Sequence, residues 1–137
     1  MRKINFLLIL FYPFILFADY SWERSPAESL VKDGINALYN YQFDFAITIL
    51  DSAWNLDDEH PLIPFVMISA KWLKSQTEEG YDASYFLIDN EVEKTIPIYK
   101  ELIKKYPNDP EIVLYLGSTY GIRARTAMAS KEWLNVL

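Results

Sequence analysis

The chain has 137 residues, a formal net charge of −6 and no cysteine. A sequence pI of about 4.7 argues against nucleic acid as a partner, because binding a phosphate backbone requires clustered Lys and Arg. The lack of cysteine excludes disulfide frameworks and thiolate metal sites within this sequence. With 51% hydrophobic and 16% aromatic residues, the chain can bury a core, and its length suits one domain.

The first 18 residues are predicted to form a secretory signal peptide. Arg2 and Lys3 precede the apolar run 4–18, which is short for a transmembrane helix of about 20 residues. Charge, apolar run and small residue in that order are typical of a signal peptide, here cleaved after Ala18. We therefore expect an exported protein, periplasmic or secreted, without a stable membrane span after cleavage. An uncleaved inner-membrane anchor is the alternative.

The first two helices are predicted from capping residues and apolar spacing. After a linker at 19–25, Ser25 can cap a helix in which Pro26 takes the first position and Glu28 reaches back to the cap. A turn near Asn40–Gln42 separates this helix from the second. The apolar stripes of the two helices comprise Leu30, Ile35, Leu38, Tyr39, Phe45, Ile49, Leu50, Ala53, Trp54 and Leu56.

Two more helices are expected on either side of a polar stretch. The third helix covers 62–74, and the polar stretch 75–84 should be the least structured part, with Gly80 as its hinge. Beyond it, apolar residues recur every three or four positions over some 20 residues, which is the period of an α-helix. Pro97 lies inside this segment and should kink or restart the helix.

The last long helix is predicted at 111–128. Asp109 should cap it, with Pro110 in the first helical position. A further helix begins at "WLNVL", residues 133–137. Because no segment shows the two-residue alternation of a strand, we predict an all-α domain over 26–137.

Internal similarity connects these helices. A shift of 49 residues places Pro61 on Pro110, and a shift of 83 places Gly34 on Gly117. Because 83 is 49 plus 34, one repeat period is about 34 residues and the other is longer. With these features the chain resembles the tetratricopeptide repeat (TPR), a helix–turn–helix unit of 34 residues. The resemblance implies antiparallel helix pairs stacked as a short TPR-like α-solenoid. Another α-solenoid, or an irregular bundle with coincidental small residues, is the alternative.

The resemblance also implies roles for individual residues. Asp58, Thr95 and Leu102 depart from the family pattern, so the middle unit fits it least. The residues that pack within and between repeats would be Gly34, Ala46, Leu50, Ala53, Tyr99, Pro107, Leu116, Gly117 and Tyr120. The first helix of each pair lines a concave surface in this family, which implies a partner-binding groove at Glu28, Val31, Ile35, Leu38, Leu114, Ser118 and Ile122.

The C-terminal residues 133–137 are mostly apolar, whereas a solenoid normally ends in a helix with a polar outer face. Two expectations follow. The sequence is a fragment whose repeat domain is incomplete at the C-terminus, or its exposed helix edge docks on a partner or self-associates.

No motif for catalysis is present in the sequence. His60 is the only histidine, and it lies in the acidic stretch "DDEHP", which we interpret as a solvated turn rather than a metal site. Nothing in the pattern places Asp51 or Glu101 in a pocket, as acid–base catalysis would require. We therefore predict no enzyme activity, cofactor or metal.

The predicted function is a non-catalytic protein–protein interaction scaffold of the cell envelope that binds a protein or peptide. Four tyrosines are candidates for an exposed recognition surface: Tyr39, Tyr41, Tyr81 and Tyr85. The alternative function is a helical solute-binding accessory protein of a transport system, with an aromatic pocket for a small ligand.

Overall fold

The fold comes from a computed structural model, which describes residues 22–130. Within that range the chain is helical and has no strand, so the predicted all-α class is confirmed. None of the helices there is both long enough and apolar enough to cross a bilayer. The predicted signal peptide and the apolar segment 133–137 lie outside the described residues. The elements are η1 (Trp22–Arg24), α2 (Glu28–Tyr39), α3 (Phe43–Leu56), α4 (Leu62–Glu78), α5 (Tyr81–Lys105) and α6 (Pro110–Ala129).

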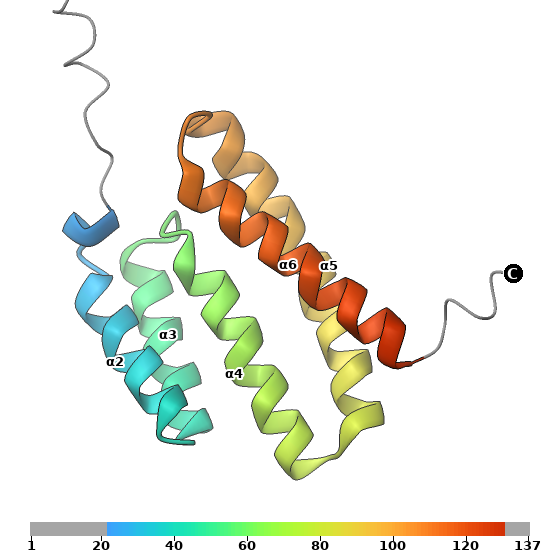
Figure 1. The fold of residues 1–137 in the computed structure, drawn as a ribbon. Helices are drawn as coiled ribbons and strands as arrows, with labels where there is room; N and C mark the ends of the chain where they lie inside the picture. The colour runs from blue at the N-terminus through green and yellow to red at the C-terminus, as the bar shows by residue number, and fades with distance from the viewer. Residues whose placement is uncertain (1–21, 131–137) are drawn as a thin grey trace, which may run out of the picture.

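Successive helices run antiparallel and pack against each other along the chain (Figure 1). The pair α2–α3 lies on one side of α4, and the pair α5–α6 lies on the other. Helix α4 also touches α2 and α6. This central position makes α4 the element on which both helix pairs rest.

The α2–α3 crossing explains the glycine in α2. A Cβ atom at Gly34 would lie 2.8 Å from Cγ of Leu50, which is fully buried on α3. Ala46 and Ala53 of α3 are also fully buried. Small residues let the two helix backbones approach closely, so the helix-propensity cost of glycine is offset by packing.

The α4–α5 pair is held by apolar packing and one buried hydrogen bond. Ile68 of α4 packs with a row of buried residues on α5. The hydroxyl group of Tyr99 on α5 donates to the carbonyl oxygen of Pro61 over 2.7 Å. Pro97 was predicted to kink or restart this helix, and α5 continues through it without a restart. Pro97 and Glu93 are both exposed, so water can bond the Glu93 carbonyl that loses its helical donor.

Helix boundaries agree with some of the predicted signals. The Asp109 side chain accepts a hydrogen bond from the Glu111 amide over 2.8 Å, and Pro110 is the first residue of α6, as predicted. Gly80 has φ +93°, a conformation that favours glycine, and it separates α4 from α5. The surrounding stretch 75–84 is nevertheless helical on both sides of Gly80, so its prediction as unstructured is wrong.

The predicted start of α2 differs from the structure. Ser25 accepts a hydrogen bond from the Ala27 amide and donates one to Asp57, 2.5 Å away. Glu28 does not reach back to Ser25, because its carboxylate bonds His60. A contact made across 32 residues therefore replaces the local capping box.

Candidate functional site

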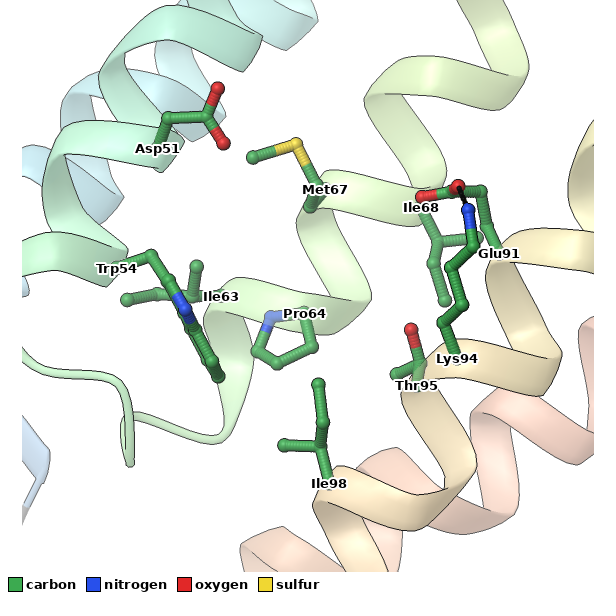
Figure 2. A pocket seen from close by; sticks show the side chains of 10 residues that line it. All are labelled: Asp51, Trp54, Ile63, Pro64, Met67, Ile68, Glu91, Lys94, Thr95 and Ile98. Atoms are coloured by element: carbon green, nitrogen blue, oxygen red, sulfur yellow. Dashed lines mark hydrogen bonds and ion pairs between the residues drawn. The ribbon is translucent and has the colours of Figure 1, made fainter.

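A groove runs between α3 and α5, with α4 as its floor. In the described part of the chain α3 and α5 do not pack against each other, and a pocket of about 190 Å³ lies between them (Figure 2). Trp54 of α3 and Ile98 of α5 face this pocket from opposite sides. Its floor on α4 is Ile63, Pro64, Met67 and Ile68.

A second pocket extends the first towards the C-terminal end of α3. It has a volume of about 270 Å³ and shares Trp54 and Ile98 with the first pocket. It adds Leu102 from α5 and the turn after α3. We name the two pockets together the α3/α5 groove.

The rim of the α3/α5 groove is acidic. Five carboxylates line it, against two lysines, Lys94 and Lys105. The five are Asp51, Asp58, Glu59, Glu91 and Glu101. For two of these residues, Asp51 and Glu101, nothing in the sequence indicated a pocket, and the structure places both, exposed, on the rim of the groove. The groove could not be predicted from the sequence, because its two walls are about 45 residues apart and are joined only through α4.

Three of the five rim carboxylates are held in ion pairs: Glu59, Glu91 and Glu101. Glu91 bonds Lys71 at 2.6 Å and Lys94 at 3.0 Å. Burial raises the pKa of Glu91, but the hydrogen bonds from the two lysines outweigh it, so the pKa lies below its ordinary value. Hydrogen bonds from Lys105 and the Tyr106 hydroxyl group likewise lower the pKa of Glu59. Both groups are therefore ionised at neutral pH.

His60 does not lie in a solvated turn, so that prediction is wrong. It is 2% exposed, and its Nε2 atom lies 3.0 Å from Oε2 of Glu28. Its Nδ1 atom accepts the Leu62 amide at 3.3 Å, so neutral His60 carries its proton on Nε2 and donates it to Glu28. Its ring also packs near that of Trp22, with centroids 5.8 Å apart. His60 therefore joins the turn before α4 to α2.

The predicted partner-binding residues occupy different environments. Val31 is 1% exposed and packs with Ala27, Ala53 and Ile63, which removes it from any groove. Its side chain is buried because α2 turns this face towards α3 and α4. Ile35 and Leu38 are partly buried against the neighbouring cluster that contains Ala46, Leu50 and Val66. Glu28 bonds His60. On α6, Leu114 is exposed, whereas Ser118 and Ile122 are half-buried.

The predicted repeat-packing residues divide into two groups. Gly34, Ala46, Leu50 and Ala53 meet at the α2–α3 crossing, and Leu116 packs in the cluster that contains Tyr99. Three others do not pack: Pro107, Gly117 and Tyr120 are exposed. Gly117 and Tyr120 are exposed because α6 rests on α5 and α4 with one face only, and no other described element covers the opposite face. Pro107 lies in the turn before α6.

Exposed aromatic residues gather at the turns that join α2 to α3 and α4 to α5. Tyr39, Tyr41 and Tyr81 are exposed, and Tyr85 is half-buried. Phe45, placed on the apolar stripe of α3 from its spacing, is exposed as well. An ion pair between Asp44 and Lys74, 2.5 Å long, joins α3 to α4 near these turns.

Other chemistry is sparse in the part of the chain that the structure describes. Between residues 22 and 130, no group of three or more His, Asp or Glu side chains is arranged to hold a metal ion. Comparison of the chain with protein families, curated proteins and solved structures finds no match.

Proposed function

We propose that this protein is a non-catalytic scaffold that binds a protein or peptide segment and is built from TPR-like helix pairs. The observation that carries the proposal is the α3/α5 groove, with its apolar floor and acidic rim. The contacts of α4 with both α2 and α6 support the stacking of successive helix pairs. The signal-peptide pattern at 1–18 supports a place in the cell envelope.

The α3/α5 groove is divided into two small pockets of about 190 and 270 Å³. Each pocket is smaller than the roughly 300–1,000 Å³ of a typical small-molecule site, so each suits a single side chain better than a whole metabolite. Trp54 and Ile98 form walls for an apolar anchor. The net negative rim favours Lys or Arg beside that anchor. The occupant we propose is a segment with an apolar anchor flanked by basic residues.

The alternative function, a solute-binding accessory of a transport system, is favoured by a different pocket. This pocket lies between α5 and α6 and has a volume of about 430 Å³. Its lining combines the aromatic Tyr85 and Phe86 with the cation Arg123. Ion pairs with Asp89 and Glu93 already engage Arg123, so an anionic solute would have to compete with both carboxylates. This competition makes the peptide-binding proposal the stronger of the two.

The test is selection of peptides from a displayed random library, followed by fluorescence anisotropy with the selected peptides. We expect an apolar residue flanked by Lys or Arg. Asp51→Lys, on the rim, should weaken binding about tenfold, which corresponds to 1.4 kcal/mol. Asp33→Lys makes the same charge change on an exposed part of α2 outside the groove and should leave the affinity unchanged. Selected peptides without basic residues, or equal effects of the two variants, would contradict the proposal.

A further inference from the structure

Helices α5 and α6 form a pocket where the first half of α5 lies beside the second half of α6 (Figure 1). We name it the α5/α6 pocket. Its volume of about 430 Å³ lies within the roughly 300–1,000 Å³ of a typical small-molecule site. Positions i, i+3, i+4 and i+7 share one face of a helix, and each helix lines the pocket with one such row. The row on α5 is Asp82, Tyr85, Phe86 and Asp89.

The α6 wall leaves the pocket hollow because three of its four side chains are short: Thr126, Ala127 and Ser130. The hydroxyl groups of Thr126 and Ser130 donate to carbonyl oxygens of their own helix, at 2.8 and 3.2 Å. Because their hydrogens are used in this way, both oxygens can act only as acceptors towards a ligand. This wall therefore suits a ligand that brings hydrogen-bond donors.

The formal charge of the α5/α6 pocket is negative. Arg123, the fourth residue of the α6 wall, already bonds Asp89 at 3.3 Å and Glu93 at 3.4 Å. Asp82 forms no hydrogen bond or ion pair with any residue that the structure describes. Its place in the first turn of α5 suits the helix dipole and leaves the carboxylate exposed. Within the described residues, one negative charge of the pocket therefore lacks a balancing cation.

Aromatic rings stand beside this unbalanced carboxylate. Phe86 follows Asp82 by about one helical turn, and its side chain is 79% exposed. Tyr85, next to it in the chain, is half-buried. Among residues 22–130, no aromatic ring or cation packs on the ring of Phe86. A cation is attracted to the face of an aromatic ring when it lies within about 6 Å of the ring centroid. A free ring next to an unpaired carboxylate is therefore suited to an organic cation.

We propose that the α5/α6 pocket binds an organic cation that consists of an ammonium group and an attached apolar group. The ammonium group bonds Asp82 and lies against the ring of Phe86, and the apolar group fills the space beside Ala127. An anion would be repelled by Asp82, and a neutral ligand would leave Asp82 unpaired. No residue of this pocket lines the α3/α5 groove, so this proposal and the peptide-binding proposal stand or fall separately.

The test compares three ligands that share a phenyl ring and differ in charge at neutral pH. The probes are benzylammonium, benzyl alcohol and benzoate, each titrated into the isotope-labelled protein and followed by its amide NMR signals. Benzylammonium should shift the signals of residues 82–89 and 123–130 and should bind at least about tenfold more tightly than benzyl alcohol. Benzoate should bind more weakly than either.

Three variants connect the binding to named groups. Asp82→Asn should raise the Kd of benzylammonium about fivefold, because it removes the unpaired charge. Asp33→Asn makes the same change at an exposed carboxylate on α2 and should leave the Kd unchanged. Arg123→Gln frees Asp89 and should lower the Kd of benzylammonium, whereas in a pocket for anions it would raise the Kd of benzoate.

Several results would overturn the proposal. Tighter binding of benzoate than of benzylammonium would show a pocket for anions. Absence of binding by benzylammonium up to about 10 mM would show that the pocket has no such ligand. Equal effects of Asp82→Asn and Asp33→Asn would indicate non-specific attraction to a negatively charged protein.

A last variant tests whether the chain supplies its own ammonium group. Lys131 directly follows Ser130, which lines the pocket. Lys131→Gln should leave the Kd of benzylammonium unchanged. A Kd about tenfold lower in this variant would show that Lys131 occupies the pocket in the unaltered protein, and it would overturn the proposal of a separate ligand.

Discussion

Replacing Gly34 with alanine tests the close α2–α3 crossing directly. At an exposed position inside a helix, replacing glycine with alanine stabilises the protein by about 1 kcal/mol. At Gly34 the new Cβ would lie 2.8 Å from Cγ and 2.9 Å from Cδ2 of Leu50. Leu50 is fully buried, and its Cγ is a branch point rather than a flexible end, so its neighbours must shift. Overpacking of this kind costs about 1–3 kcal/mol, so we expect a net loss of about 1 kcal/mol.

The assay is urea unfolding followed by far-UV circular dichroism at one fixed, low protein concentration. In a thermal melt followed by the same signal, a loss of 1 kcal/mol would lower the melting temperature by about 4–8 °C in a domain of this size. Gly117→Ala is the control, because its Cβ meets no described atom within 4 Å. It should stabilise the protein by about 1 kcal/mol. The two glycines should therefore respond with opposite signs.

A second background isolates Leu50 as the cause. Leu50→Ala alone should cost about 2–5 kcal/mol, because it empties a buried site. In that background Gly34→Ala should become stabilising, since the obstructing side chain is gone. If Gly34→Ala stabilises the unaltered protein as much as Gly117→Ala does, the close crossing is refuted.

Three further predictions concern polar contacts. Tyr99→Phe leaves the buried Pro61 carbonyl without its donor, and urea unfolding should show a loss of about 1–2 kcal/mol. Asp109→Ala removes the cap of α6 and also the acceptor of the Trp22 indole N–H, 2.8 Å away, so in the same assay it should cost more than the roughly 1 kcal/mol of a cap alone; no loss would argue against the cap. Burial raises the pKa of Glu28, but hydrogen bonds from His60 and Lys32 lower it below the ordinary 4.5. The stability that ionised Glu28 contributes is fully present above pH 4.5 and is lost as the pH falls through the lowered pKa. On lowering the pH from about 6 to about 3, the free energy of unfolding of Glu28→Gln should therefore fall less than that of the unaltered protein, and an equal fall would contradict this prediction.

Helix boundaries could be predicted from the sequence wherever the signal was local. Asp109 and Pro110 mark the start of α6, and Gly80 marks the break between α4 and α5. Each of these signals acts through the backbone of its own few residues, so it can be read without knowing the fold. The same holds for the helical period and for Gly34 as a site of close approach. At Pro97 the helix continues without a restart, because exposure to water relieves the missing hydrogen bond.

Which side chains are buried, and which surfaces exist, depends on how distant helices pack and could not be predicted from local patterns. His60 is surrounded by acidic residues in the sequence, yet it is buried because Glu28 and Trp22 lie over it. Spacing gives Gly34 and Gly117 the same role, but Leu50 covers one and no described residue covers the other. Helical periodicity shows that a face exists, whereas burial depends on which distant helix packs there. Long-range contacts determine which helix packs on a given face. Here they produce the α3/α5 groove and leave the side of α6 that carries Gly117 exposed.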